Sequence, residues 1–207
     1  MVWSCLVSIL PGMAQTEKLT DYVNPFVGTD GYGNVYPGAQ IPFGGIQISP
    51  DTDSRFYDAA SGYKYNHLTL MGFSLTHLSG TGIPDLGDFL FIPGTGEMKL
   101  EPGTHEDPDQ GYRSRYSHDK EWASPNYYAV ELADYGVKAE MTSGVRSGMF
   151  RFTYPESDNA FIMIDMNHTL WQSCEWSNLR MINDSTITGY KLVKGWGPER
   201  HVYFTAT

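Results

Sequence analysis

VKAEMT at residues 137–142 and MFRFTY at residues 149–154 are the two stretches that decide the fold. In each of them apolar and polar residues alternate, which places the apolar side chains on one face of a β-strand and the polar ones on the other. The segment 143–148 between them contains two glycines and is typical of a hairpin connection. The sequence therefore predicts two half-buried antiparallel strands here.

Further strands are expected on both sides of this hairpin, and no amphipathic helix separates them. The first part of the chain is rich in turn formers, because NPFVGTDGYGNVYPGAQIPFGG, which starts at Asn24, holds six glycines and three prolines. This pattern favours an all-β, antiparallel β-sandwich over a parallel α/β sheet, formed as one domain over residues 15–207. The expected additional strands are residues 46–48, 89–92, 127–132, 160–166, 186–193 and 202–207.

Composition narrows the classes of partner. Of 207 residues, 14 are Lys or Arg and 24 are Asp or Glu, which gives a net charge of −10. A negative field repels phosphate backbones and anionic lipids, so neither nucleic acid nor a membrane surface is an expected partner. The two cysteines are Cys5 and Cys174, and Cys174 loses its only possible partner in the chain if the first 14 residues are removed. We therefore do not expect disulfides to hold the fold.

The N-terminus resembles an export signal. Residues 2–10 form an apolar run as long as a signal-peptide core, and residues 12–14 supply small side chains of the kind that a signal peptidase recognises. We predict a signal peptide over residues 1–14 and a periplasmic or extracellular location, although a buried N-terminal strand is the alternative. No later run approaches the roughly 18 apolar residues of a membrane span.

The richest stretch for chemistry begins at His77. It is followed by Ser79-Gly80-Thr81-Gly82, which exposes backbone N–H groups and hydroxyls, and then by Asp85 and Asp88. This set of groups suits a polyol such as a sugar, whereas the alternative for His77 is a structural hydrogen bond. Catalysis by Ser79 with His77 as its base would need a strand-to-helix elbow, which the sequence does not predict.

Taken by themselves, the aspartates and histidines of the sequence give weaker evidence for a functional site than the stretch that begins at His77. Asp30, Asp85 and Asp88 are the carboxylates inside glycine-rich loops, where the usual role of an aspartate is to cap a turn. The histidines lack the spacing of a metal site, and Asp51-Thr52-Asp53 continues toward Arg55 rather than into further oxygen ligands. No metal site is expected in this chain.

Several motifs together resemble the N-terminal domain of glycoside hydrolase family 92, whose members are calcium-dependent, inverting exo-α-mannosidases. The resemblance is carried by DYVNPFVGTD at residues 21–30, YPGA at 36–39, PFG at 42–44, SPDT at 49–52, SGY at 61–63 and the run from Gly72 to Asp88. It continues in the same order to Val202-Tyr203-Phe204.

The resemblance implies a β-sandwich that packs against an (α/α)6 domain, which carries the acid, the base and the calcium ligands and is not among these 207 residues. The match stops within the sandwich, so the domain is expected to be incomplete at its C-terminal end. This chain is then expected to hold no catalytic residue and to be inactive by itself. Family loops that wall the mannose pocket correspond to Gly28, Thr29, Asp30, Arg55, His77, Ser79, Gly80, Thr81 and Gly82. Ile83-Pro84 departs from the family pattern, which leaves the preferred linkage open.

Three hypotheses follow for function. The first is the N-terminal sandwich of an exported α-mannosidase, with a mannose-containing glycan and the (α/α)6 domain as partners. The alternatives are a free-standing, non-catalytic carbohydrate-binding or interaction module, and an autonomous glycosidase that uses Asp30, Asp85 or Asp88. If the sandwich is separated from its helical domain, an open strand edge at residues 202–207 and an exposed apolar patch are expected. The residues predicted for that patch are Tyr36, Phe43, Phe73 and Leu78.

Overall fold

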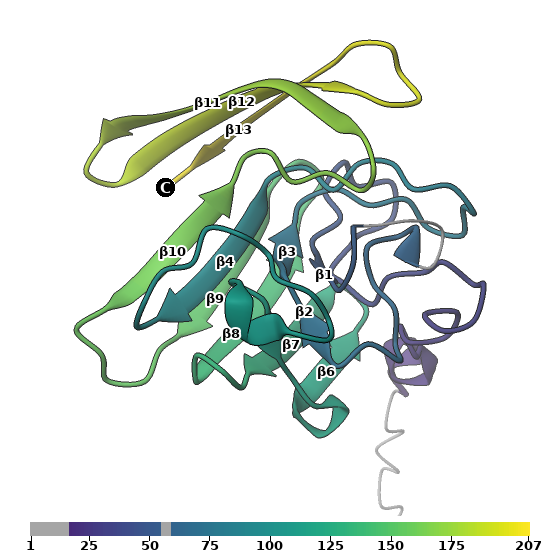
Figure 1. The fold of residues 1–207 in the computed structure, drawn as a ribbon. Helices are drawn as coiled ribbons and strands as arrows, with labels where there is room; N and C mark the ends of the chain where they lie inside the picture. Colours follow the sequence, from purple (N-terminus) through teal and green to yellow (C-terminus); the bar gives the residue numbers. More distant parts are fainter. Residues whose placement is uncertain (1–16, 55–58) are drawn as a thin grey trace, which may run out of the picture.

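The computed structural model describes residues 17–54 and 59–207, and these residues fold as antiparallel β-structure with short 3-10 turns (Figure 1). The predicted signal peptide at residues 1–14 lies outside the described residues. The strands are β1 (Ser49–Asp51), β2 (Thr69–Leu70), β3 (Gly72–Ser74), β4 (Leu90–Thr95), β5 (Ser114–Arg115), β6 (Glu121–Ser124), β7 (Tyr127–Leu132), β8 (Val137–Ser143), β9 (Gly148–Thr153), β10 (Ala160–Asp165), β11 (Ser173–Asn183), β12 (Thr186–Lys194) and β13 (Arg200–Ala206). The 3-10 turns are η1 (Leu19–Tyr22), η3 (Pro108–Gln110) and η4 (His118–Lys120).

Two four-stranded sheets form the sandwich, in the orders β1-β3-β4-β10 and β6-β7-β8-β9. The predicted hairpin is confirmed: Val130 on β7 pairs with Ala139 on β8, which pairs with Phe152 on β9. The apolar residues of this alternating pattern point toward the first sheet, where the ring of Phe73 on β3 lies 6.4 Å from that of Phe152. Burial of this face against the other sheet is what the period-two alternation encodes.

A third sheet, β11-β12-β13, lies across one end of the sandwich (Figure 1). Phe204 on β13 anchors it, because its ring centroid lies 4.6 Å from that of Phe89 and 5.7 Å from that of Phe91. Within the described part of the chain, β13 has β12 as its only neighbour, so its other edge is open, as predicted. The small pair β2-β5 completes the fold.

The predicted apolar patch is wrong in two of its four residues. Phe73 is fully buried and Tyr36 is 7% exposed, and both belong to the main core. The reason is the pleat of β3, which turns the Phe73 ring toward the β6–β9 sheet. Phe43 is 100% exposed, as predicted, and Leu78 is half-buried.

The strand predicted at residues 46–48 is not formed, because within this segment only Ile48 makes an isolated bridge, to Ala39.

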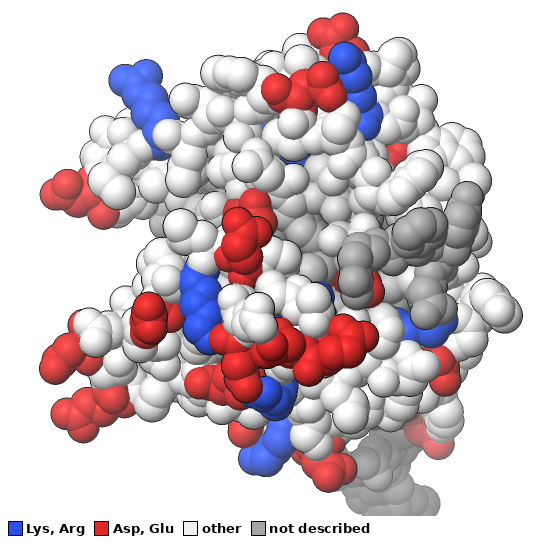
Figure 2. All heavy atoms as spheres, viewed as in Figure 1, with Lys and Arg blue, Asp and Glu red and all other residues white. Residues whose placement is uncertain are grey.

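The surface carries the negative charge that the composition implies. Acidic side chains gather across the lower half of the face drawn in Figure 2, with lysine and arginine set among them. The thiol of Cys174 is free, and Cys5 lies outside the described residues. Among residues 17–54 and 59–207, no helix has the length and apolar character needed to cross a membrane.

Candidate functional site

Two glycine-rich loops that are far apart in sequence lie side by side, and we call them the rim. The first contains Gly28 to Asn34 and the second contains Ser79 to Gly82. They are joined where the N–H of Gly80 donates to the carbonyl oxygen of Asn34 at 2.7 Å. Gly28 and Gly80 have φ values of +86° and +74°, which glycine adopts without the penalty that a side chain would bring.

The structure therefore brings together most of the predicted contact residues. Asp30, Ser79, Gly80 and Gly82 are exposed, Gly28 and Thr81 are half-buried, and Thr29 is buried. The carbonyl oxygen of Thr29 accepts a hydrogen bond from the N–H of Tyr65 at 2.9 Å, which ties the rim to the sandwich. The predicted residue Arg55 lies outside the described residues.

His77 lies beneath the rim and is 3% exposed. Its Nδ1 is 2.7 Å from the carbonyl oxygen of Gln47 and its Nε2 is 2.7 Å from Oδ1 of Asp51. The hydroxyl of Ser74 is a further neighbour and lies 3.0 Å from Nε2. Both ring nitrogens of His77 are therefore engaged in hydrogen bonds inside the fold, which gives the ring a structural role rather than that of a base for Ser79.

Asp51 is the centre of this buried cluster. Its second oxygen, Oδ2, lies 2.7 Å from Nε2 of His168, and the Asp51 side chain is fully buried. Burial by itself would raise the pKa of Asp51, but the charge of His77 and the hydrogen bonds from both imidazoles lower the pKa well below its usual range. Asp51 is therefore ionised and joins three segments of the chain.

Sequence reasoning missed His168 and the central role of Asp51. The two residues are 117 positions apart, and no local pattern relates them. The available signal was the SPDT motif that ends β1, because a carboxylate inside a buried strand needs a partner.

A second buried charge cluster joins the sandwich to the third sheet. Asp88 pairs with Lys191 on β12 at 3.2 Å and with Arg200 at the start of β13. Burial raises the pKa of Asp88, but the two cations outweigh it, so that the pKa lies below its ordinary value. Asp88 therefore stays ionised, which makes it unsuited to the role of a general acid. Asp85 also forms a local hydrogen bond, because its Oδ1 accepts a hydrogen bond from the backbone N–H of Leu86 at 2.6 Å.

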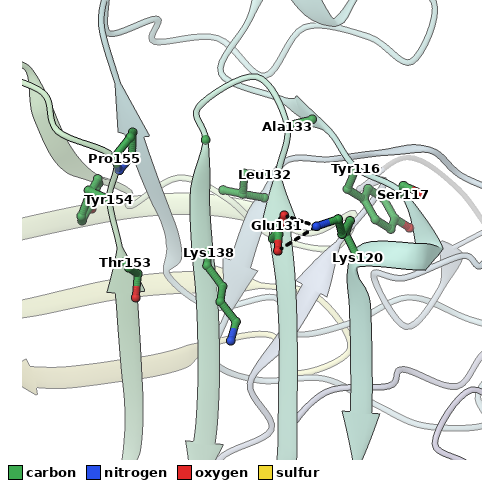
Figure 3. A pocket seen from close by; sticks show the side chains of 11 residues that line it. Tyr116, Ser117, Lys120, Glu131, Leu132, Ala133, Lys138, Thr153, Tyr154 and Pro155 are labelled. Atoms are coloured by element: carbon green, nitrogen blue, oxygen red, sulfur yellow. Dashed lines mark hydrogen bonds and ion pairs between the residues drawn. The ribbon is translucent and has the colours of Figure 1, made fainter.

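Cavities open on the described surface beside the buried cluster and at the turn between β7 and β8. One of about 310 Å³, here called the Trp171 pocket, lies beside the buried cluster and is lined by His168, Trp171, Gln172 and their neighbours. The other, of about 650 Å³, lies at the β7–β8 turn (Figure 3). There Lys120 pairs with Glu131 at 3.1 Å, and Lys138 extends from the neighbouring strand (Figure 3).

Among residues 17–54 and 59–207, no three His, Cys, Asp or Glu side chains are grouped so that they could hold a metal ion.

Known proteins resemble this chain over most of its length. Residues 22–207 match the glycosyl hydrolase family 92 N-terminal domain. An uncharacterized secreted glycosidase of Arthroderma benhamiae is 30% identical over 139 residues, which is 66% of this chain and 17% of that protein.

Two solved structures share the fold. The GH92 family glycosyl hydrolase ccman5 superposes with a TM-score of 0.73 at 28% identity, covering 90% of this chain and 26% of that one. The family GH92 inverting mannosidase BT2199 of Bacteroides thetaiotaomicron gives a TM-score of 0.71 at 25% identity, covering 92% and 25% of the two chains. This chain thus spans about a quarter of the length of each solved relative and a smaller share of the fungal protein. Over nearly its whole length it belongs to glycosyl hydrolase family 92, as the N-terminal domain of that family.

Proposed function

We propose that this chain is the N-terminal β-sandwich of an exported α-mannosidase and that its rim forms part of the mannose pocket. The observation that carries the proposal is the family match over residues 22–207, together with the mannosidase identity of a solved relative with the same fold. The rim supports it further, because two loops predicted to contact substrate are hydrogen-bonded to each other. Export is supported by the secreted fungal relative.

The chemistry of hydrolysis is assigned to residues outside the described part of this chain. An inverting glycosidase needs a protonated acid and a carboxylate base about 6.5–9.5 Å apart, with a water between the base and the sugar. Asp88 is held ionised, which does not suit the acid, and it is buried against two cations, which does not suit the base; Asp85 accepts a backbone hydrogen bond. Calcium is likewise proposed to bind residues outside the described part.

Two measurements test this proposal. The purified 207-residue chain should release no 4-nitrophenol from 4-nitrophenyl α-mannoside, with or without calcium, because the catalytic pair of carboxylates is proposed to lie outside the described residues. Release above the buffer blank that is abolished by Asp30→Asn, Asp85→Asn or Asp88→Asn would establish an autonomous glycosidase instead.

The contribution of the rim is tested by binding. Line broadening of methyl α-mannoside in NMR should weaken in Asp30→Asn, whereas Asp21→Asn, an exposed change outside the rim, should leave it unaltered. An Asp30→Asn variant that behaves as wild type contradicts the assignment of Asp30 to the pocket. A non-catalytic binding module remains the second candidate, and a gene that encodes no helical domain downstream of codon 207 would favour it.

A further inference from the structure

We propose that the Trp171 pocket is a separate binding site for a neutral pyranose sugar, with the indole of Trp171 as its platform and His168 as a hydrogen-bond partner. The inference rests on the proposed function for its glycan substrate and adds a second point of contact, away from the residues of the rim. Its volume of about 310 Å³ lies at the lower end of the range for small-molecule pockets, which suits a single ring rather than a long chain.

The backbone holds Trp171 in an unusual conformation. Its φ is +77°, a left-handed value that is unfavourable for a bulky side chain, and the side chain is 59% exposed. The loop around it is fixed: the hydroxyl of Thr169 donates to the carbonyl oxygen of Gln172 at 2.7 Å, and the N–H of Leu170 donates to that of Leu86 at 3.0 Å. A fixed loop thus keeps a large apolar ring at the wall of a pocket instead of in the core. Such a ring can stack on the apolar face of a pyranose.

His168 supplies the polar side of the pocket. Asp51 is ionised, so Nε2 of His168 carries the proton and donates to it. Within the described part of the chain, Nδ1 of His168 has no hydrogen-bond partner. A ligand hydroxyl, which both donates and accepts, can therefore pair with it.

Other lining groups narrow the ligand class. Both carboxylate oxygens of Asp165 are occupied, one by the hydroxyl of Tyr112 at 2.9 Å and the other by the N–H groups of Asn167 and His168. Among the described residues that line the pocket there is no lysine or arginine, so an anionic ligand would meet no counter-charge. Hydroxyl and amide groups beside an aromatic ring fit an uncharged polyol best.

The decisive variant is Trp171→Gly, which removes the ring but places the residue that best tolerates φ of +77° at this position. The melting temperature should not fall, while the affinity for methyl α-mannoside should drop at least about 10-fold, equivalent to the loss of a stacking contact. Trp171→Phe keeps a ring and should retain most of the affinity. The matched control is Trp176→Gly, which removes an indole of similar exposure on β11, outside the pocket.

A probe of ligand class and a second variant complete the test. Saturation-transfer NMR should detect methyl α-mannoside on wild type but not mannose 6-phosphate, because the described residues that line the pocket include no lysine or arginine. His168→Gln should also weaken binding. Any one of four results would overturn the inference. These are wild-type affinity in Trp171→Gly, equal losses of affinity in Trp171→Gly and Trp176→Gly, preference for mannose 6-phosphate, and no binding of either sugar. Loss only in the rim variant Asp30→Asn would overturn it while supporting the proposed function, whereas hydrolysis by the isolated chain would overturn the proposed function alone.

Discussion

Replacing Asp51 by asparagine tests whether the buried cluster holds the sandwich together. The carboxylate is fully buried and accepts two hydrogen bonds of 2.7 Å, both from imidazoles. The amide keeps one acceptor oxygen but turns an NH2 group toward a ring N–H and leaves the charge of His77 unbalanced. Removing one member of a buried ion pair costs about 3–5 kcal/mol of unfolding free energy. At roughly 2–4 °C per kcal/mol for a chain of this size, the melting temperature should fall by roughly 6–20 °C.

The pH dependence of this difference provides a sharper test. The pKa of Asp51 is depressed in the folded state, so its stabilising contribution is present above the unfolded pKa of about 3.9 and is lost as the pH falls toward the folded pKa. Below about pH 3.9 the gap between wild type and Asp51→Asn should therefore close by about 1.4 kcal/mol per pH unit.

Urea unfolding followed by circular dichroism from pH 2.5 to 7 measures both quantities. Asp109→Asn is the control, because it removes an aspartate from a surface ion pair whose carboxylate is 72% exposed, and it should leave stability almost unchanged. A stability of Asp51→Asn within about 0.5 kcal/mol of wild type at pH 7, or a gap that stays constant on acidification, would refute the reasoning.

Three further changes test other buried features by the same unfolding measurement. Gly62→Ala should destabilise by more than about 1 kcal/mol, because φ is +85° and the new Cβ would lie 2.0 Å from Oδ1 of Asp51; a neutral effect would contradict this geometry. Glu121→Gln should cost about 1.5–3 kcal/mol, since the buried carboxylate accepts from two tyrosine hydroxyls and an imidazole, and a smaller loss would show that those bonds are weak. Lys191→Met should cost about 1–3 kcal/mol, because Asp88 loses one of its two cations in a buried setting, whereas a gain would show that desolvation of the ammonium outweighs the pair.

Alternation of apolar and polar residues predicted β8 and β9, and a short apolar run predicted the buried strand β4. The predicted bounds of β7, β8 and β9 agree with the structure to within two residues. β11 was missed because most of its residues are exposed, so that no buried apolar face marks it in the sequence. Short strands such as β1 are buried on both faces and are not distinguished by alternation.

The candidate site shows a similar division between local and distant information. The glycine loops of the rim can be recognised in the sequence, because the conformation of a turn depends mainly on the residues of the turn itself. The role of His77 depends instead on acceptors at Gln47 and Asp51, which only the folded chain brings near. Sequence reasoning could name His77 as a polar group of interest, with a structural hydrogen bond as the alternative, and the geometry gives it a structural role.

The link from Asp51 to His168 also affects the order of events during synthesis. Their separation of 117 residues means that the ribosome makes the second partner roughly 6–23 s after the first, at 5–20 residues per second. His77 can pair with Oδ1 of Asp51 soon after synthesis, but throughout that interval Oδ2 has no imidazole partner and depends on water. Full burial of this carboxylate therefore becomes a late step of folding, which follows the emergence of the β10–β11 connection.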